Sequence, residues 1–163
     1  MPVLVLYGVT GAGKSLVGRL LATQLGWPFY DADDLHTPSN LDRLSDGIPL
    51  TDADRWPWLQ RVRALIAGCI QRGTGAVVAC SALKAEYREY LRIDDRVKLI
   101  HLTGDVGLIA ERLRQREGHF MNPALLRSQA DALEPAGPET ALVLDVASDP
   151  DQIVRAIRTQ LAL

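Results

Sequence analysis

The chain has 163 residues, 47% of them hydrophobic and 23% charged, a composition typical of one globular domain with its own buried core. Its 18 Lys and Arg are balanced by 20 Asp and Glu, and the net charge of −2 excludes a general basic field that would attract nucleic acid or an anionic membrane. The two cysteines, Cys69 and Cys80, form no C-x-x-C pair, so neither a disulfide framework nor a zinc site is expected.

Short apolar runs alternate along the chain with segments of helical periodicity. Strands are predicted at residues 3–7, 29–31, 76–80, 98–102 and 142–146. Helices are predicted at residues 14–25, 52–72, 84–91, 105–116, 123–133 and 150–161. This alternation is typical of βαβ units, so we expect a single α/β domain in which helices flank a five-stranded parallel sheet. The first apolar run is far shorter than a signal peptide or a membrane span, and we expect a cytoplasmic protein.

Residues 8–15, between the first strand and the first helix, fit the phosphate-binding pattern G-x-x-x-x-G-K-[ST]. Backbone N–H groups of such a loop surround a phosphate, and the following helix directs its positive end at the same anion. Lys14 is expected to reach the terminal phosphates, and the Ser15 hydroxyl to bind Mg²⁺. The nucleotide contacts expected from this segment are Gly11, Ala12, Gly13, Lys14, Ser15 and Leu16. The pattern therefore predicts a nucleoside triphosphate site.

The second predicted strand ends in acidic residues. Alternate residues of an extended segment share a face, so Asp31 and Asp33 are expected to project together. If this strand lies beside the first, both carboxylates face the phosphate loop. We assign Asp31 to the water shell of the metal and Asp33 to the general base that accepts a proton from an attacking hydroxyl. Asp34 is the expected N-cap of a following helix, and His36 is expected to contact the substrate.

Four further polar residues lie on or next to predicted helices. Asp52 is the expected N-cap of the long helix, and Arg55, one turn on, has a guanidinium suited to a carboxylate or polyol. Ser81 either lies near the metal or caps the next helix. Arg88 either faces the substrate or pairs in solvent with a neighbouring glutamate.

Arg112 and Arg116 lie four residues apart on one predicted helix and therefore on one face. They precede a polar segment, 117–136, that the sheet does not need, and segment 36–54 has the same character. In a phosphoryl-transfer enzyme such segments cover the substrate and exclude water. The two arginines are suited to the charge on a transferring phosphoryl group, with Arg116 as a catalytic residue; the alternative is a solvated face paired with glutamates.

Together these segments resemble the gluconokinase family of small P-loop carbohydrate kinases, related to shikimate and nucleoside-monophosphate kinases. Besides the phosphate loop, the resemblance rests on D-x-D-D-L-H at 31–36, D-R-x-P-W-L at 54–59, C-S-A-L-K at 80–84, and G-H-F-M at 118–121 followed by S-Q at 128–129. It covers nearly the whole chain.

The resemblance implies a P-loop kinase fold, usually in a homodimer, that uses ATP and Mg²⁺ to convert D-gluconate to 6-phosphogluconate. The acceptor contacts that it implies are Asp33, His36, Arg43, Arg55, Arg88, His119 and Gln129. Segment 36–54 would cover the acceptor, and segment 117–136 would form a mobile lid. Two alternatives remain: a kinase for another polyhydroxy acid such as shikimate, and a nucleotide-dependent switch, although the chain lacks the guanine-specifying N-K-x-D motif.

Overall fold

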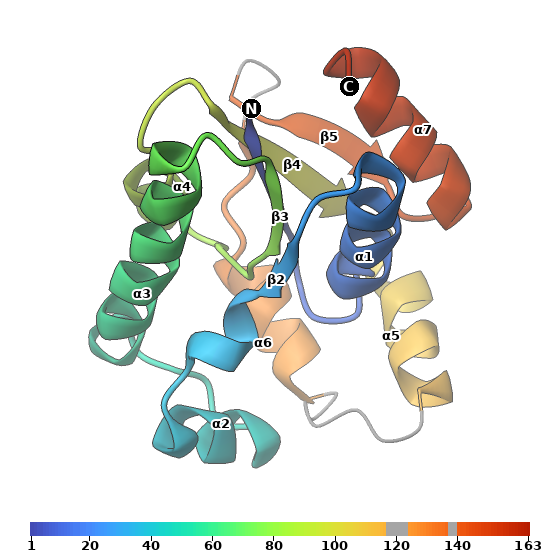
Figure 1. Ribbon diagram of the computed structural model, residues 1–163. Helices are drawn as coiled ribbons and strands as arrows, with labels where there is room; N and C mark the ends of the chain where they lie inside the picture. The colour runs from blue at the N-terminus through green and yellow to red at the C-terminus, as the bar shows by residue number, and fades with distance from the viewer. Residues whose placement is uncertain (117–123, 137–139) are drawn as a thin grey trace.

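The computed structural model describes residues 1–116, 124–136 and 140–163. Its centre is a parallel sheet of five strands in the order β2-β3-β1-β4-β5 (Figure 1). The strands are β1 (Val3–Tyr7), β2 (Phe29–Asp31), β3 (Ala76–Ala79), β4 (Val97–Thr103) and β5 (Leu142–Asp145). The helices are α1 (Lys14–Leu25), α2 (Pro38–Ser45), α3 (Asp52–Gln71), α4 (Ala85–Leu91), α5 (Val106–Gln115), α6 (Ala124–Ala132) and α7 (Pro150–Gln160), with a 3₁₀ helix, η1 (Ala32–Leu35), after β2.

The two faces of the sheet carry separate hydrophobic layers. Val3, Val5 and Tyr7 of β1 face the layer that includes α3 and α4, whereas Leu4 and Leu6 face the layer that includes α1, α5 and α7. All five residues of β1 are fully buried, because a central parallel strand is covered on both sides. The predicted α/β class and five-stranded parallel sheet are therefore confirmed.

Helix α1 packs unusually close to the sheet at Gly18. A Cβ at this position would lie 2.6 Å from Cε2 of Phe29 in β2, so a larger residue would push the helix away. This approach positions α1 over β2 and β3 as well as β1. The start of α1, where the phosphate loop ends, consequently lies within reach of the end of β2.

The sequence prediction located every strand and six helices to within about two residues at the ends that the structure describes. The sequence predicted no helix or strand in the middle of segment 36–54, where the structure has α2. It also left open which strand lies beside β1. The neighbours are β3 and β4, so the condition that β2 lies directly beside β1 is not met.

The turn after β2 corrects the prediction for Asp34. The cap of η1 is Asp31, whose side chain accepts a hydrogen bond of 3.1 Å from the N–H of Asp33. The cap of α2 is Thr37, followed by Pro38 in the first turn, a combination that favours a helix start. Asp34 caps neither helix.

The starts of α3 and α4 also differ from the prediction. Thr51, not Asp52, is the N-cap of α3, and it forms a reciprocal capping box with Asp54. Ser81 does not cap α4, because Lys84 occupies that position and makes no side-chain capping bond. Within the described ranges, no helix combines the length and apolar character needed to cross a membrane.

Candidate active site

The phosphate loop joins β1 to α1 and adopts a backbone that requires glycine. Gly11 and Gly13 have φ angles of 78° and 91°, in the left-handed region. A Cβ on Gly11 would also lie 2.6 Å from Cγ of Leu113 in α5. Lys14 Nζ donates to the carbonyl of Val9 at 2.9 Å, and burial lowers the pKa of this lysine.

Ser15 connects this loop to the end of β2. Its hydroxyl donates a hydrogen bond of 2.7 Å to Oδ2 of Asp31, while Oδ1 of the same carboxylate accepts from Asp33 N–H. Asp31 is therefore held in one orientation by two independent donors. Although β3 lies between β2 and β1, the two predicted metal-binding residues are in direct contact.

The neighbouring carboxyl of Asp33 lines the same pocket as Lys14. Burial, reinforced by the negative charge of Asp31, raises the pKa of Asp33 to about 6, and Lys14 opposes this shift only in part. A carboxyl group with a pKa near neutrality can accept and return a proton during a reaction. The residues that line this pocket are Thr10, Gly11, Gly13, Lys14, Ser15, Asp31, Asp33, Ala79, Ser81, Arg116 and Gln129.

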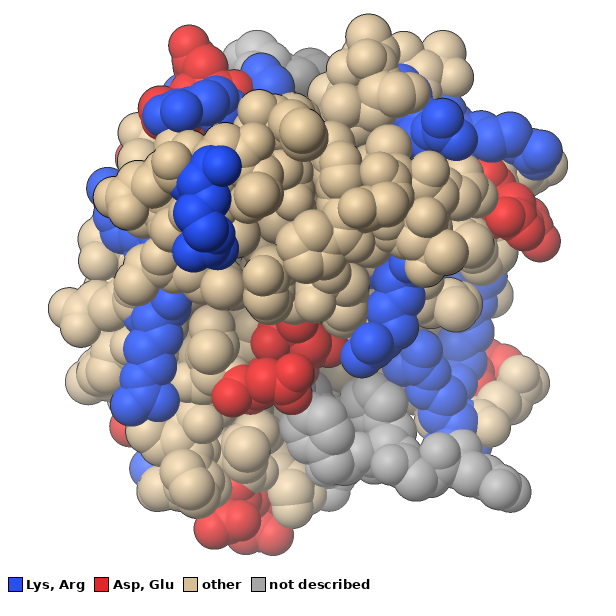
Figure 2. Space-filling view, in the orientation of Figure 1, with Lys and Arg blue, Asp and Glu red and all other residues tan. Residues whose placement is uncertain are grey.

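The donor set fits a hard divalent cation such as Mg²⁺. The Ser15 hydroxyl and the Asp31 carboxylate offer oxygen atoms, the ligands that such a cation prefers, and the Asp33 carboxyl lines the same pocket. Figure 2 shows acidic side chains gathered over η1 near the middle of the view, with basic side chains of α1 and α5 beside them.

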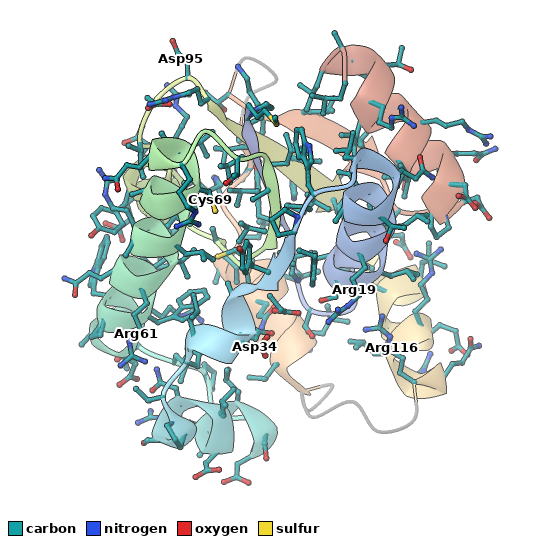
Figure 3. The ribbon with its side chains drawn as sticks, viewed as in Figure 1. Arg19, Asp34, Arg61, Cys69, Asp95 and Arg116 are labelled. Atoms are coloured by element: carbon teal, nitrogen blue, oxygen red, sulfur yellow. The ribbon has the colours of Figure 1, made fainter. Side chains whose placement is uncertain are left out.

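A second cavity, of about 360 Å³, lies on the other side of the loop. Leu16, Val146 and Ile153 give it apolar walls, and Arg112 and Arg116 lie at its edge. Arg112 donates to the carbonyl of Val146 at 2.7 Å. Arg116 lines both this cavity and the phosphate-loop pocket, and Figure 3 shows it at the end of α5 on the side of α1.

His36 is buried beside Asp33, with 3.9 Å between His36 Nε2 and Asp33 Oδ1. Its ring stacks on Trp58 with 4.2 Å between centroids, and the Trp58 indole N–H donates to the carbonyl of Ala32 at 2.6 Å. Burial and the charge of Arg55 lower the pKa of His36 to about 4, so the ring is neutral at pH 7. Its Nδ1 is buried and has no hydrogen-bond partner within the described ranges.

Arg55 and Arg43 lie on elements next to this histidine. The guanidinium carbon of Arg55 is 6.0 Å from the centre of the Tyr87 ring, and Arg43 lies 3.8 Å from Asp54. Asp52 accepts hydrogen bonds from both Lys84, at 2.9 Å, and the Tyr87 hydroxyl. This junction of α3 and α4 was not predicted, although Lys84 belongs to the C-S-A-L-K motif.

The structure places Arg88 away from the predicted acceptor contacts. Its side chain is buried and donates to the carbonyls of Ala82, Leu83 and Glu134 at 3.1, 2.7 and 2.5 Å. The guanidinium carbon also lies 4.7 Å from the centre of the Tyr7 ring. Neither sequence alternative describes it: its guanidinium donates to backbone carbonyls, and its burial excludes a solvent-exposed pair with a glutamate.

Two other predicted acceptor contacts lie on or before α6. His119 is outside the described residues. Gln129 is buried and lines the phosphate-loop pocket, where its Oε1 accepts a hydrogen bond of 2.7 Å from Thr10 N–H. Thr10 and Ala79 also line this pocket but were not assigned to it from the sequence, whereas Ser81 lines it beside Ser15 and Asp31, in agreement with the first of its two alternatives. The C-S-A-L-K motif at the end of β3 was the available signal for Ser81.

Comparison with known proteins first defines the class. The family model described as "Shikimate kinase" matches residues 10–139, so the chain is a P-loop kinase of the shikimate-kinase type. It is 44% identical over 156 residues to the gluconokinase of Gluconobacter oxydans, covering 94% of this chain and 88% of that protein. It is 40% identical over 157 residues to the thermosensitive gluconokinase of Escherichia coli, covering 94% and 84%. The chain belongs to the gluconokinase family.

Solved structures agree with this assignment. A gluconokinase from Sinorhizobium meliloti matches with a TM-score of 0.88 and 41% identity, covering 99% of this chain and 91% of that one. A sugar kinase from Janibacter sp. matches with a TM-score of 0.93 and 38% identity, covering 99% and 95%. As a member of a P-loop kinase family, the chain uses ATP.

Proposed function

We propose that this chain transfers the γ-phosphoryl group of ATP to D-gluconate, forming 6-phospho-D-gluconate and ADP. The observation that carries the proposal is the pocket that Lys14 and Ser15 of the phosphate loop share with the carboxyl of Asp33, whose pKa is raised to about 6. Relatives named gluconokinase, at 40–44% identity over more than nine tenths of the chain, support gluconate as the acceptor.

The loop and α1 would bind the triphosphate. Backbone N–H groups from Gly11 to Leu16 and the Lys14 ammonium would neutralise its terminal phosphates, and the apolar cavity beside Leu16 would take the nucleoside. Mg²⁺, held by the Ser15 hydroxyl and through water by Asp31, would supply further positive charge to the β- and γ-phosphate oxygens. Arg112 and Arg116, which line the cavity beside Leu16, would contact the phosphates from α5.

Asp33 would act on the acceptor hydroxyl. Because its pKa is close to neutrality, it would accept the hydroxyl proton as the oxygen attacks the γ-phosphorus. Arg116 would stabilise the negative charge on the equatorial oxygens of the transferred group. Asp33, Arg116 and Lys14 would thus be the catalytic residues.

The acceptor would be held by one cation and several polar groups. Arg55 is suited to the gluconate carboxylate, with Arg43 nearby, and the neutral His36 ring would contact an acceptor hydroxyl. Gln129 lines the pocket, and His119 stays an expectation from the family resemblance. Arg88 is left out of this set because its donors bind backbone carbonyls. We also expect a homodimer, which light scattering in solution would detect.

An ADP-release assay with a panel of acceptors tests the function. Gluconate should give turnover well above shikimate, other sugar acids and an acceptor-free control, and Lys14→Ala should lower it by roughly 10²–10³-fold. ADP release that does not depend on an acceptor would instead support a nucleotide-dependent switch. Preference for shikimate would contradict the assignment; the solved shikimate kinases are only 15–23% identical to this chain and share its fold.

A further inference from the structure

Helix α6 reaches the phosphate loop through the buried side chain of Gln129. Gln129 Oε1 accepts the Thr10 N–H at 2.7 Å, and both residues are only 5% exposed. Thr10 is the third residue of the loop, whose remaining backbone must adopt the geometry that binds phosphate. A side chain 119 residues further along the chain therefore fixes the orientation of one peptide of the loop.

The glutamine amide is suited to this role because it is uncharged. It accepts a backbone hydrogen bond without adding a negative charge to the pocket that would bind the phosphates. A buried hydrogen bond also leaves a costly unpaired N–H when its acceptor is removed, so the peptide is held firmly. Gln129 thus acts on the loop backbone, besides any contact of its Nε2 with the acceptor.

The same helix contacts the segment that would cover the acceptor. Leu125 packs with Leu44 of α2 and with Leu50, and these three form a small hydrophobic cluster apart from the two main layers. Leu125 and Gln129 are four residues apart, so they lie on one face of α6 in successive turns. Figure 1 shows α6 at the carboxyl edge of the sheet, between α2 and α5.

We propose that Gln129 is a positioning residue that ties the phosphate loop to α6, and that α6 transmits the position of segment 36–54 to this loop. The inference rests on the proposed function in one respect: the ligand that orders segment 36–54 is the acceptor. Acceptor binding would then tighten the packing of Leu125 and, through Gln129, favour the loop geometry that binds ATP. Such coupling is reciprocal, so ATP would favour acceptor binding by the same factor.

Hydrogen exchange of the loop tests the physical link without any acceptor. Gln129→Ala should speed exchange in a peptide spanning residues 8–15 at least tenfold, and Leu125→Ala should speed it several-fold from the far end of the helix. Asp131→Ala, an exposed change on α6, is the matched control and should have no effect. Circular dichroism and melting would confirm that each variant is folded. If hydrogen exchange in the loop is unchanged in Leu125→Ala, α6 does not transmit the position of segment 36–54 to the loop, and the proposal is wrong.

Calorimetry of a non-hydrolysable ATP analogue, with and without gluconate, measures the coupling itself. Gluconate should tighten the analogue about fivefold or more in the wild type. The enhancement should fall below twofold in Gln129→Ala and Leu125→Ala and persist in Asp131→Ala. Equal enhancement in Gln129→Ala and wild type would overturn the role of Gln129.

The Gln129→Glu variant distinguishes the role of Gln129 in holding the loop from a role in binding the substrate. Its carboxylate can still accept the Thr10 N–H, so loop exchange should stay near the wild-type rate, whereas ATP binding should weaken because of the added charge. Rapid exchange in this variant would contradict the positioning role. If the wild type does not phosphorylate gluconate at all, the proposed function fails, and the exchange experiment still decides whether Gln129 and α6 hold the loop.

Discussion

The hydroxyl of Ser15 and the carboxylate of Asp31 are joined by a hydrogen bond of 2.7 Å that connects the start of α1 to the end of β2. Since β3 separates β2 from β1, this contact depends on α1 crossing over the intervening strand. It brings two oxygen ligands together beside Asp33, whose function can therefore be tested separately from theirs.

Asp33→Asn and Asp31→Asn should have different effects. Asp33→Asn should preserve nucleotide binding but remove the proton acceptor, lowering kcat by roughly 10²–10⁴-fold. Asp31→Asn should mainly raise the Mg²⁺ concentration needed for half-maximal rate, because the Ser15 hydroxyl loses a charged partner. Steady-state kinetics over a magnesium titration separates them. Identical magnesium titrations for the two variants would show that the roles of general base and metal binding are wrongly assigned to Asp33 and Asp31.

Lys14→Ala should lower kcat by roughly 10²–10³-fold, because it removes a positive charge from the site of the transferred phosphoryl group. The fold should be retained, since the side chain makes one hydrogen bond, to the carbonyl of Val9. Turnover is measured by coupled ADP release, and the fold by circular dichroism. A folded variant with near wild-type turnover would refute the assignment of the loop.

Arg55→Ala should weaken gluconate by about 1.5–3 kcal/mol, which corresponds to a roughly 10–150-fold higher KM, with little change for ATP. Arg72→Ala, at the other end of α3, is a control that should affect neither substrate. Arg116→Ala should instead lower kcat, with a smaller effect on gluconate. If Arg55→Ala lost ATP binding and kept normal gluconate binding, the assignment of Arg55 to the gluconate site would be wrong.

Arg88→Met should destabilise the fold without a specific effect on gluconate. The change leaves three carbonyls, two of them buried, without their donor, which costs about 2–4 kcal/mol and lowers Tm by roughly 4–16 °C in a chain of this size. Thermal melting and KM are compared in the same preparation. An unchanged Tm together with a several-fold higher KM for gluconate would restore the acceptor role expected from the sequence.

His101 should make stability depend on pH. It is buried on β4, stacked on Tyr7 with 4.6 Å between ring centroids, and burial with the charge of Arg88 lowers its pKa to about 4. The unfolded chain, with a histidine pKa near 6.5, binds more protons between these values. This contribution to stability is complete above pH 6.5 and decreases as the pH falls toward 4, by about 2 kcal/mol between pH 7 and pH 5.

Urea denaturation of His101→Phe at the two pH values checks this. The substitution keeps an aromatic ring against Tyr7 and removes the titrating group, so the loss of stability on acidification should be smaller by about 2 kcal/mol. An equal loss in variant and wild type would mean that His101 is already protonated at neutral pH or pairs with an acid.

Sequence patterns were sufficient where the determinants are local. The phosphate loop is set by glycines within eight residues, and the strands by continuous apolar runs. Helix α2 was missed because eight largely polar residues carry little periodic signal, although Thr37 and Pro38 mark its start. The role of Arg88 was missed because its partners come from separate segments, one of them Glu134, 46 residues away. Such contacts depend on the tertiary fold.

The parallel sheet also separates the two ends of the molecule. Figure 3 shows Asp95 at the opposite end from Asp34 and Arg116. Asp95 is exposed in the turn between α4 and β4, at the amino edge of the strands. A cysteine introduced there would carry a dye or a surface linker some distance from the phosphate loop. The enzyme could thus be immobilised in a defined orientation with its substrate entrance facing the solution.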